Sequence, residues 1–378
     1  MHGTFNYVNP ATIHYGAGSA FCLDEVLAAA SIHRVHIVTT QSLTKTKSYR
    51  RLLEESSRLG EATTSIVSSH VPIETVLSSA RDIRRSSAQA VVAIGGGSAA
   101  DAAKLAAHGA SFTRLDQGIS LDDFGTLLKN EPELDSLPVY IVPTTLSAAE
   151  LYGDAGYTDS STGHKTGVHN SSMTPRAVFY DPEVAAETPR QLWVSTGVRA
   201  IDHAVEATLS YETNPISRTL AASAVKDLLT VLPRTVAGTD DADDRLAGFM
   251  GAWKSFTAPP EAAGGISHAL SRMIGAKNGI AHGVTSGVVL PQVIRYLHAH
   301  DEQARIRLNE LASVAGCGDS GLALAEAVEE LVRGVGLPAF FSANQICAGI
   351  AAEAARKAAQ ETGTSMQVAS AIMAQCIR

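Results

Sequence analysis

Residues 93–109 read AIGGGSAADAAKLAAHG, and this stretch decides the fold that we expect. A buried apolar strand ends at Ile94, three glycines follow, and a helix begins at Ser98. Consecutive glycines let the backbone turn tightly and approach a ligand closely. Ser98 is a good helix cap, and a helix start offers free N–H groups and a partial positive charge to an anion. The stretch therefore predicts a strand–turn–helix unit that binds a pyrophosphate; the alternative is a plain turn.

Strands and helices alternate through the first half of the chain. The segments 42–60 and 73–88 have helical periodicity, and residues 152–174 are rich in Gly, Ser and Thr, which favours a loop or hairpin. Alternating strands and helices predict a parallel sheet with helices on both faces. The expected strands are short, apolar and β-branched, and they span 35–40, 90–94, 139–145 and 177–181.

The pattern changes after Pro182. From about residue 183 onward the sequence shows only Ala- and Leu-rich amphipathic segments broken by Gly and Pro. A chain of 378 residues also exceeds what one hydrophobic core usually supports. We therefore expect an α/β dinucleotide-binding domain over 1–182 and an all-α domain over 183–378 that carries the substrate- or metal-site residues.

The composition limits the classes of partner and the cellular location that we expect. The net charge of −8 argues against nucleic acid or an anionic membrane as partner, and the apolar stretches are too short to span a bilayer. The N-terminus lacks the basic and apolar regions of an export signal. The four cysteines are far apart with no CxxC pair, which is typical of reduced thiols. These features predict a cytoplasmic protein that acts on a small molecule.

Several motifs in order resemble one family. GGGSAADAAK (95–104) resembles the GGGSxxDxAK signature of the iron-containing alcohol dehydrogenase family, also called group III. Further similar segments are 13–20, 142–150, 179–189 and 264–291, so the resemblance covers nearly the whole chain. It implies a dehydroquinate synthase-like fold, with a Rossmann-like N-terminal domain and an all-α C-terminal domain. It also implies NAD(P)H bound between the two domains, and a homodimer.

The resemblance implies a set of cofactor-binding residues. The glycine turn would hold the pyrophosphate, and Asp101 would orient that loop or the nicotinamide ribose. At the end of the second strand the family usually has Asp, which binds the ribose 2′-hydroxyl of NAD, but here Thr40 stands there. Thr40 either tolerates the 2′-phosphate of NADPH or still bonds the hydroxyl of NAD. The other implied residues are Gly95, Gly96, Gly97, Ser98, Thr144, Thr145, Ser147 and Lys165.

The family's metal site is altered in this chain. Metal-binding members use one Asp and three His, and His203, His268 and His282 match the histidine positions. The aspartate position, one helical turn before the first histidine, is Arg199. A catalytic histidine that the family often has four residues after the second ligand is Arg272 here.

Arg199 argues against a tightly held metal. Three histidines suffice for a catalytic zinc in principle. However, a fixed cation about 4–5 Å away opposes a divalent ion by several kcal/mol at an effective dielectric constant of about 20. Asp202 points about 100° away around the helix, and Glu206 lies one turn further on. We therefore expect no tightly bound divalent metal; if zinc or iron is present, the three histidines hold it.

The two arginines suggest what replaces the metal. A guanidinium is a planar, permanently charged fork that suits a carboxylate. Arg199 and Arg272 on facing helices could hold an acidic substrate and polarise its carbonyl, while a neighbouring histidine delivers the proton. This arrangement resembles the maleylacetate reductase branch of the family. The alternatives are that Arg199 pairs with Asp202 or Glu206 on its own helix and that Arg272 is structural.

These observations give a leading function and two alternatives. The leading hypothesis is an NAD(P)H-dependent oxidoreductase that reduces the carbonyl of a small, anionic oxo compound. The first alternative is a metal-dependent alcohol dehydrogenase in which water or Glu206 completes the ligand set. The second is a non-redox cyclase or lyase on the same scaffold.

Overall fold

The computed structural model describes residues 12–130, 134–160, 163–210, 214–257 and 265–378. The chain divides into two compact units. The first ends at Thr188, and the second spans Pro189–Arg378. The sequence suggested a boundary at residue 182, and the division in the structure falls a few residues later. Each unit is described by itself.

The first unit contains the expected parallel sheet. Its strands lie in the order β1-β8-β5-β4-β2-β3, and every neighbouring pair is parallel. The four strands expected from the sequence appear as β2, β4, β5 and β8, which confirms the predicted α/β class. The bounds are β1 Thr12–Tyr15, β2 Val35–Thr40, β3 Thr63–Val67, β4 Ala90–Gly95, β5 Val139–Pro143 and β8 Ala177–Tyr180.

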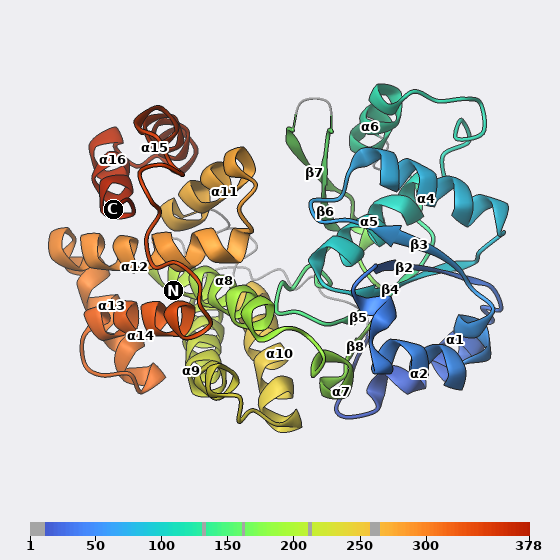
Figure 1. Cartoon of the computed structure of the whole chain (residues 1–378), viewed down its shortest axis with the longest axis horizontal. Coiled ribbons are helices and arrows are strands. Elements are labelled where there is room, and N and C mark those ends of the chain that lie inside the picture. The colour runs from blue at the N-terminus through green and yellow to red at the C-terminus, as the bar shows by residue number, and fades with distance from the viewer. Residues whose placement is uncertain (1–11, 131–133, 161–162, 211–213, 258–264) are drawn as a thin grey trace. The chain divides into compact units, whose positions relative to one another are not determined.

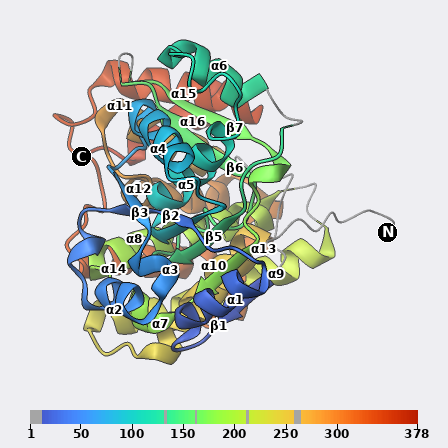
Figure 2. The same cartoon turned by 90° about the vertical axis from the view of Figure 1, so that its right-hand side faces the viewer.

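Helices cover both faces of this sheet. Val91 and Ala93 of β4 pack in a core with α4, α5 and α6, whereas Val92 and Ile94 pack in a second core with α1, α2 and α3. In Figure 1, α4 and α6 accordingly lie on one side of the strands and α1 and α2 on the other, as they do in Figure 2. The bounds are α1 Leu23–Ala29, α2 Lys47–Glu55, α3 Ser57–Gly60, α4 Ile73–Arg85, α5 Gly97–Gly109, α6 Leu121–Asn130, α7 Pro182–Ala185, η1 Ser19–Cys22, η2 Leu43–Lys45 and η3 Ser171–Met173.

The edge strand β3 was not predicted from the sequence. Its residues read TTSIV and most of them are exposed, so they carry little apolar signal. A buried histidine of β2 fixes this strand: His36 Nδ1 lies 2.7 Å from Thr63 Oγ1, and its Nε2 lies 2.8 Å from Ser65 Oγ. Burial lowers the pKa of His36 to about 4. His36 is therefore a neutral structural residue that joins two strands.

The Gly-, Ser- and Thr-rich segment forms the expected hairpin. β6 (Asp154–Thr158) and β7 (Lys165–His169) pair antiparallel, outside the six-stranded sheet. Helix α5, which follows β4 in the chain, contacts this hairpin. The hairpin therefore lies beside the helix that begins at the glycine turn.

The second unit is helical, as the sequence suggested. Among its described residues the only β-type pairing is the isolated bridge between Phe341 and Ile377. One of its cores is formed by side chains of α11, α12, α15 and α16. Within the described ranges, no helix is long and apolar enough to cross a membrane. The bounds are α8 Arg190–Leu209, α9 Pro215–Ala237, α10 Ala242–Thr257, α11 Ile266–Asn278, α12 His282–His300, α13 Glu302–Ala315, α14 Gly321–Gly334, α15 Ala348–Thr362 and α16 Met366–Gln375.

Candidate active site

The glycine turn joins β4 to α5. Gly95 has a φ of +149°, a backbone conformation that residues with side chains rarely adopt. Gly96 is the N-cap of α5 and the helix begins at Gly97, so the expectation that Ser98 caps the helix is wrong. Since the cap residue is a glycine, no side chain bonds the helix start. The first N–H groups of α5 are thus not capped by a side chain and are suited to an anion.

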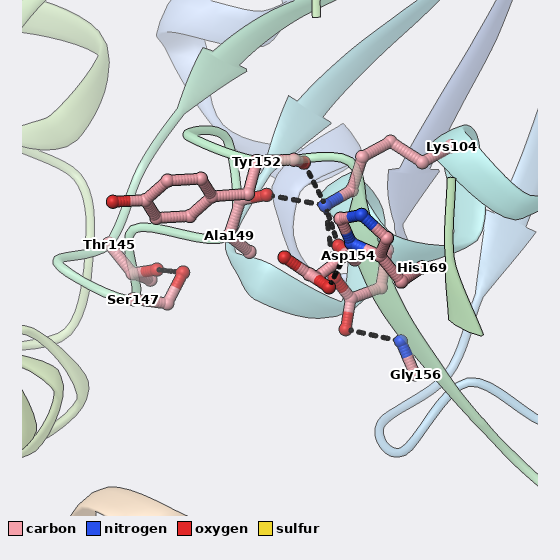
Figure 3. A network of polar contacts seen from close by, with 9 residues as sticks. Lys104, Thr145, Ser147, Ala149, Tyr152, Asp154, Gly156 and His169 are labelled. Carbon is pink, nitrogen blue, oxygen red and sulfur yellow. Dashed lines mark hydrogen bonds and ion pairs between the residues drawn. The ribbon is translucent and has the colours of Figure 1, made fainter. Parts of the chain in front are cut away.

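The loop that follows β5 packs directly on this turn. A Cβ atom on Gly96 would lie 2.8 Å from Thr145 Cγ2, and one on Gly97 would lie 3.1 Å from Ser147 Oγ. Both distances are shorter than ordinary contacts, so the close packing depends on glycine. Thr145 Oγ1 donates a hydrogen bond to Ser147 Oγ at 3.2 Å, as Figure 3 shows. The structure thus brings together two segments that the resemblance assigned to the cofactor.

A fully buried lysine fastens the same loop to α5 (Figure 3). Lys104 Nζ donates to the carbonyl oxygens of Ala149 at 2.7 Å and Tyr152 at 3.1 Å, and also to that of Asp154. An ammonium group has three N–H donors, so each donor has a carbonyl partner. Burial lowers the pKa of Lys104, and the negative charge of Asp101 opposes this effect. Lys104 therefore holds the loop through its backbone.

Asp101, one turn before Lys104, holds the hairpin. Its Oδ2 accepts the N–H of Gly156 at 3.2 Å, and its Oδ1 lies 3.7 Å from Lys104 Nζ. A Cβ on Gly156 would lie 2.9 Å from Lys165 Cε, so the stem of Lys165 runs across this glycine. Asp101 thereby orients the strand pair that carries Lys165.

Two further predicted residues lie at the carboxyl edge of the sheet. Thr40 ends β2, and its Oγ1 lies 3.2 Å from Ser42 Oγ. Thr144 follows β5, and its N–H donates to the carbonyl of Gly95 at 3.0 Å. In open α/β sheets, ligands bind outside the carboxyl ends of the strands. The predicted cofactor residues on β2, β4 and β5 thus share the edge where a dinucleotide is expected.

Glu150 is a buried carboxyl group that no sequence motif marked as a site residue. It is 1% exposed, and the hydroxyl of Tyr180 donates to its Oε1 at 3.0 Å. Burial raises the pKa of Glu150 to about 7, although the Tyr180 hydroxyl and the charge of Lys104 lower it. The available signal was an acidic residue in the loop that follows a buried strand.

In the second unit, three helices bring the predicted histidines together. His203 lies in α8, His268 in the first turn of α11, and His282 is the first residue of α12. Ring centroids are 4.9 Å apart for His203 and His268, and 4.8 Å apart for His268 and His282. Gly283 permits the approach of α12 to α8, because a Cβ there would lie 2.3 Å from the carbonyl oxygen of Ser195. We call these three residues the histidine cluster.

Arg199 and Phe256 border the histidine cluster. Arg199 lies one turn before His203 in α8, and its Cζ is 5.6 Å from the centroid of the Phe256 ring. The His203 ring centroid is 4.0 Å from that of the same phenylalanine. Burial lowers the pKa of His203 well below its usual value, and the charges of His268 and Arg199 lower it further. His203 is therefore a neutral imidazole beside a fixed positive charge. Nothing in the sequence marked Phe256.

Arg272 pairs with a carboxylate outside the histidine cluster. It lies one turn after His268 in α11, and its guanidinium forms an ion pair with Glu361 of α15. The two side chains are 46% and 36% exposed. An ion pair as exposed as this contributes little to stability. The structure thus gives Arg272 a carboxylate partner from the protein itself.

Two buried carboxyl groups flank His203 in α8. Burial raises the pKa of Asp202 to about 6, against the opposing effect of two nearby serine hydroxyls. Glu206 is buried as well, and its Oε1 accepts the N–H groups of Ser267 at 2.7 Å and His268 at 3.1 Å. Glu206 therefore bonds to the backbone of α11.

As arranged, the histidine cluster does not fit the metal ion that the resemblance implies. Arg199 stands at the aspartate position and adds a positive charge. His282 Nε2 lies 3.4 Å from His268 Nδ1, a separation at which the two imidazoles share a hydrogen bond. Across the part of the chain that the structure describes, no group of three or more His, Cys, Asp or Glu side chains could hold a metal ion.

Comparison with known proteins identifies the family. Residues 10–182 match the iron-containing alcohol dehydrogenase family, and residues 193–376 match the C-terminal part of the Fe-containing alcohol dehydrogenase family. Dehydrogenase ALT3 of Alternaria alternata is 34% identical over 73% of this chain and 76% of its own length. Maleylacetate reductase 1 of Cupriavidus pinatubonensis is 26% identical over 89% of this chain and 84% of its own.

Solved structures share the fold over the full length. Sulfoacetaldehyde reductase from Bifidobacterium kashiwanohense, in complex with NAD+, matches with a TM-score of 0.85 at 23% identity and covers 99% of both chains. Maleylacetate reductase from Agrobacterium tumefaciens matches with a TM-score of 0.79 at 21% identity, over 100% of this chain and 99% of its own. These likenesses show the fold.

Fold and family together define an NAD(P)-dependent dehydrogenase or reductase, which acts on CH–OH or C=O groups. The chain belongs to the iron-containing alcohol dehydrogenase family, and maleylacetate reductases are among its relatives.

Proposed function

We propose that this enzyme uses NAD(P)H to reduce the carbonyl group of a small anionic oxo compound, in the manner of a maleylacetate reductase, and needs no tightly bound metal. The observation that carries the proposal is Arg199. Its permanent charge occupies the position of the family's aspartate ligand and lies one helical turn from the neutral imidazole of His203. A guanidinium there attracts an anion and opposes a divalent cation.

The residues have the following roles in this proposal. NAD(P)H, when bound, supplies the hydride that the carbonyl carbon receives. Arg199 binds the acid group of the substrate or the developing alkoxide through its charged fork. The pair His268 and His282, whose ring nitrogens are 3.4 Å apart, supplies the proton that the carbonyl oxygen takes up. Arg272, already paired with Glu361, has a structural role.

The names of the relatives support an anionic substrate. Maleylacetate and sulfoacetaldehyde each combine a carbonyl group with an acid group, and reductases named for them are similar to this chain. A metal-dependent alcohol dehydrogenase is the second candidate. It is favoured by the gathering of three imidazoles and by the 29% identity to NAD-dependent methanol dehydrogenase of Bacillus methanolicus, over 69% of this chain.

A substrate panel separates the two candidates. The purified protein is incubated with NADH or NADPH and with oxo acids, sulfonated aldehydes or neutral aldehydes, before and after a chelator. We expect oxidation of the cofactor with the anionic compounds, unchanged by the chelator. One equivalent of zinc or iron that is lost together with activity would establish the second candidate. The NADH-to-NADPH ratio of kcat/KM also decides whether Thr40 accommodates the 2′-phosphate.

A further inference from the structure

We propose that Glu206 is a positioning residue whose buried carboxyl group clamps the first turn of α11 to α8 and thereby fixes His268 in the histidine cluster. The inference rests on the proposed function only in taking this cluster as the place of reaction. It assigns to Glu206 neither metal binding nor proton transfer.

The first observation is how the start of α11 is capped. The first N–H groups of a helix have no partner within the helix and need an acceptor from elsewhere. The N-cap of α11 is Gly265, which has no side chain and provides no side-chain cap. The acceptor comes from α8, because Glu206 Oε1 receives the N–H groups of Ser267 at 2.7 Å and His268 at 3.1 Å. A single oxygen atom thus serves two donors at the helix start.

The second observation is the space that Gly265 leaves. A Cβ atom on Gly265 would lie 2.4 Å from Glu206 Oε1, far inside contact distance. The φ of Gly265 is −62° and its ψ is 174°, which any residue can adopt. The backbone conformation therefore does not require glycine at this position. Glycine is needed there because the carboxyl group fills the space.

The clamp acts on the central residue of the cluster. The His268 ring neighbours both the His203 ring and the His282 ring, with centroid separations of 4.9 Å and 4.8 Å. Glu206 lies on the same helix as Arg199 and His203, so one helix presents two site residues and holds the backbone of a third. Misplacing a reacting group by about 1 Å can cost about 100-fold in rate. The bond from Glu206 to the His268 N–H therefore bears directly on the site.

The clamp needs an acceptor oxygen and does not need an ionisable group. Glutamine keeps Oε1 and both hydrogen bonds, whereas leucine, whose side chain is one atom shorter, has no acceptor. We expect kcat/KM of E206Q to stay within about threefold of the wild type, because both bonds are kept. We expect E206L to lose about 100-fold in kcat/KM, with an unchanged Kd for NADH.

Amide hydrogen exchange gives a readout that does not depend on substrate. In the wild type and E206Q, the peptide covering 265–271 should show two slowly exchanging amides from the first turn of α11. In E206L these amides should exchange rapidly, because first-turn amides have no other helix partner. The matched control is E329Q, since Glu329 is another buried carboxyl group of this unit and pairs with Arg295 and Arg333. It should leave exchange in 265–271 and kcat/KM unchanged.

Substitution of Gly265 provides a second, independent variant. G265A should accelerate the same exchange and lower kcat/KM, because its Cβ displaces the carboxyl group. Added to E206A, it should have little further effect, since the space is then empty. Additive losses in this double-mutant cycle would overturn the clamp.

Three further results would contradict the proposal. In the first, E206Q loses as much activity as E206L. In the second, the amides of 265–271 stay protected in E206L. In the third, these amides exchange rapidly in E206L but the variant keeps full activity. If the wild type reduces no oxo acid, the proposed function fails. The proposed role of Glu206 is then still tested by the exchange data and by the NMR signal of the His268 imidazole in histidine-labelled protein.

Discussion

Arg199 introduces a permanent positive charge into a cluster of imidazoles. A guanidinium stays charged at any pH at which proteins are folded, so it cannot act as a ligand to a cation. The ring of Phe256 supports its position, with the guanidinium carbon 5.6 Å from the ring centroid. The nearby imidazole of His203 adds no second charge, because burial lowers its pKa well below the usual value.

Removal of this charge should therefore be specific to anionic substrates. R199M should lower kcat/KM for an oxo acid by about 100-fold, comparable to the loss of one donor in an oxyanion hole. The same variant should change kcat/KM for a neutral aldehyde much less. Steady-state kinetics with both substrates provide the measurement.

R272M is the matched control for this prediction. Arg272 already pairs with Glu361 at the surface, so its removal should change kcat/KM by less than about threefold. A larger loss in R272M than in R199M would transfer the substrate-binding role to Arg272.

At the scale of elements, helix α5 organises the cofactor residues of the first unit. Its glycine start accepts the loop of Thr145 and Ser147, and its side chains Asp101 and Lys104 hold the hairpin and that loop. All three bonds of Lys104 go to backbone carbonyls, so they do not depend on which side chains the loop carries. One helix thus sets the relative positions of segments far apart in the sequence.

K104M should disturb this arrangement. The change removes the donor of three part-buried hydrogen bonds, and a hydrogen bond to a charged group contributes about 1.5–3 kcal/mol. We expect the free energy of unfolding to fall by about 3 kcal/mol or more and the Kd for NADH to rise about tenfold. Urea unfolding and fluorescence titration measure the two effects. K129M, at an exposed lysine of α6, should change neither quantity.

Elements with strong apolar periodicity were predictable, and polar edges were not. β2, β4, β5 and β8 are short buried runs rich in β-branched, aromatic or alanine residues, so their sequences alone indicate strands. β3 was missed because its side chains are mostly exposed, and hydrogen bonds from His36 hold it in place. Ser98 was misjudged as a cap because Gly96 already adopts the extended cap conformation.

At the scale of the whole molecule, buried ionisable groups make stability depend on pH. Burial raises the pKa of Glu150 to about 7 and lowers that of His36 to about 4. Both residues belong to the first unit. The homodimer that the resemblance implies stays a prediction, which sedimentation would test.

The two shifts act with opposite sign. Between pH 4.5 and 7 the folded state keeps the proton of Glu150 while the unfolded state loses it, so this group lowers stability as pH rises. Between pH 6.5 and 4 the unfolded state protonates His36 while the folded state does not, so this group lowers stability as pH falls. In the pH range where both groups titrate, the contributions of Glu150 and His36 to the pH dependence of stability offset each other.

The E150Q variant should reveal how much Glu150 contributes to the pH dependence of stability. An amide at this position can still accept the Tyr180 hydroxyl, but it has no proton to lose. Its stability relative to the wild type should therefore rise from pH 4.5 to 7, by an amount on the order of 3 kcal/mol. Urea unfolding of both proteins between pH 4.5 and 8 checks this. A difference that does not vary with pH would show that Glu150 titrates normally.

The sequence by itself determined the α/β and all-α division, the glycine turn, the family, and the three histidines with an arginine in the aspartate position. The division and the glycine turn follow from periodicity and spacing along the chain, whereas the family and the altered ligand position follow from the resemblance of several motifs. Only the tertiary structure decided that Arg272 pairs with Glu361, that Lys104 binds three carbonyls, and that Glu206 holds α11. Each of these contacts joins residues distant in sequence, and a side chain's partner depends on how its helix packs.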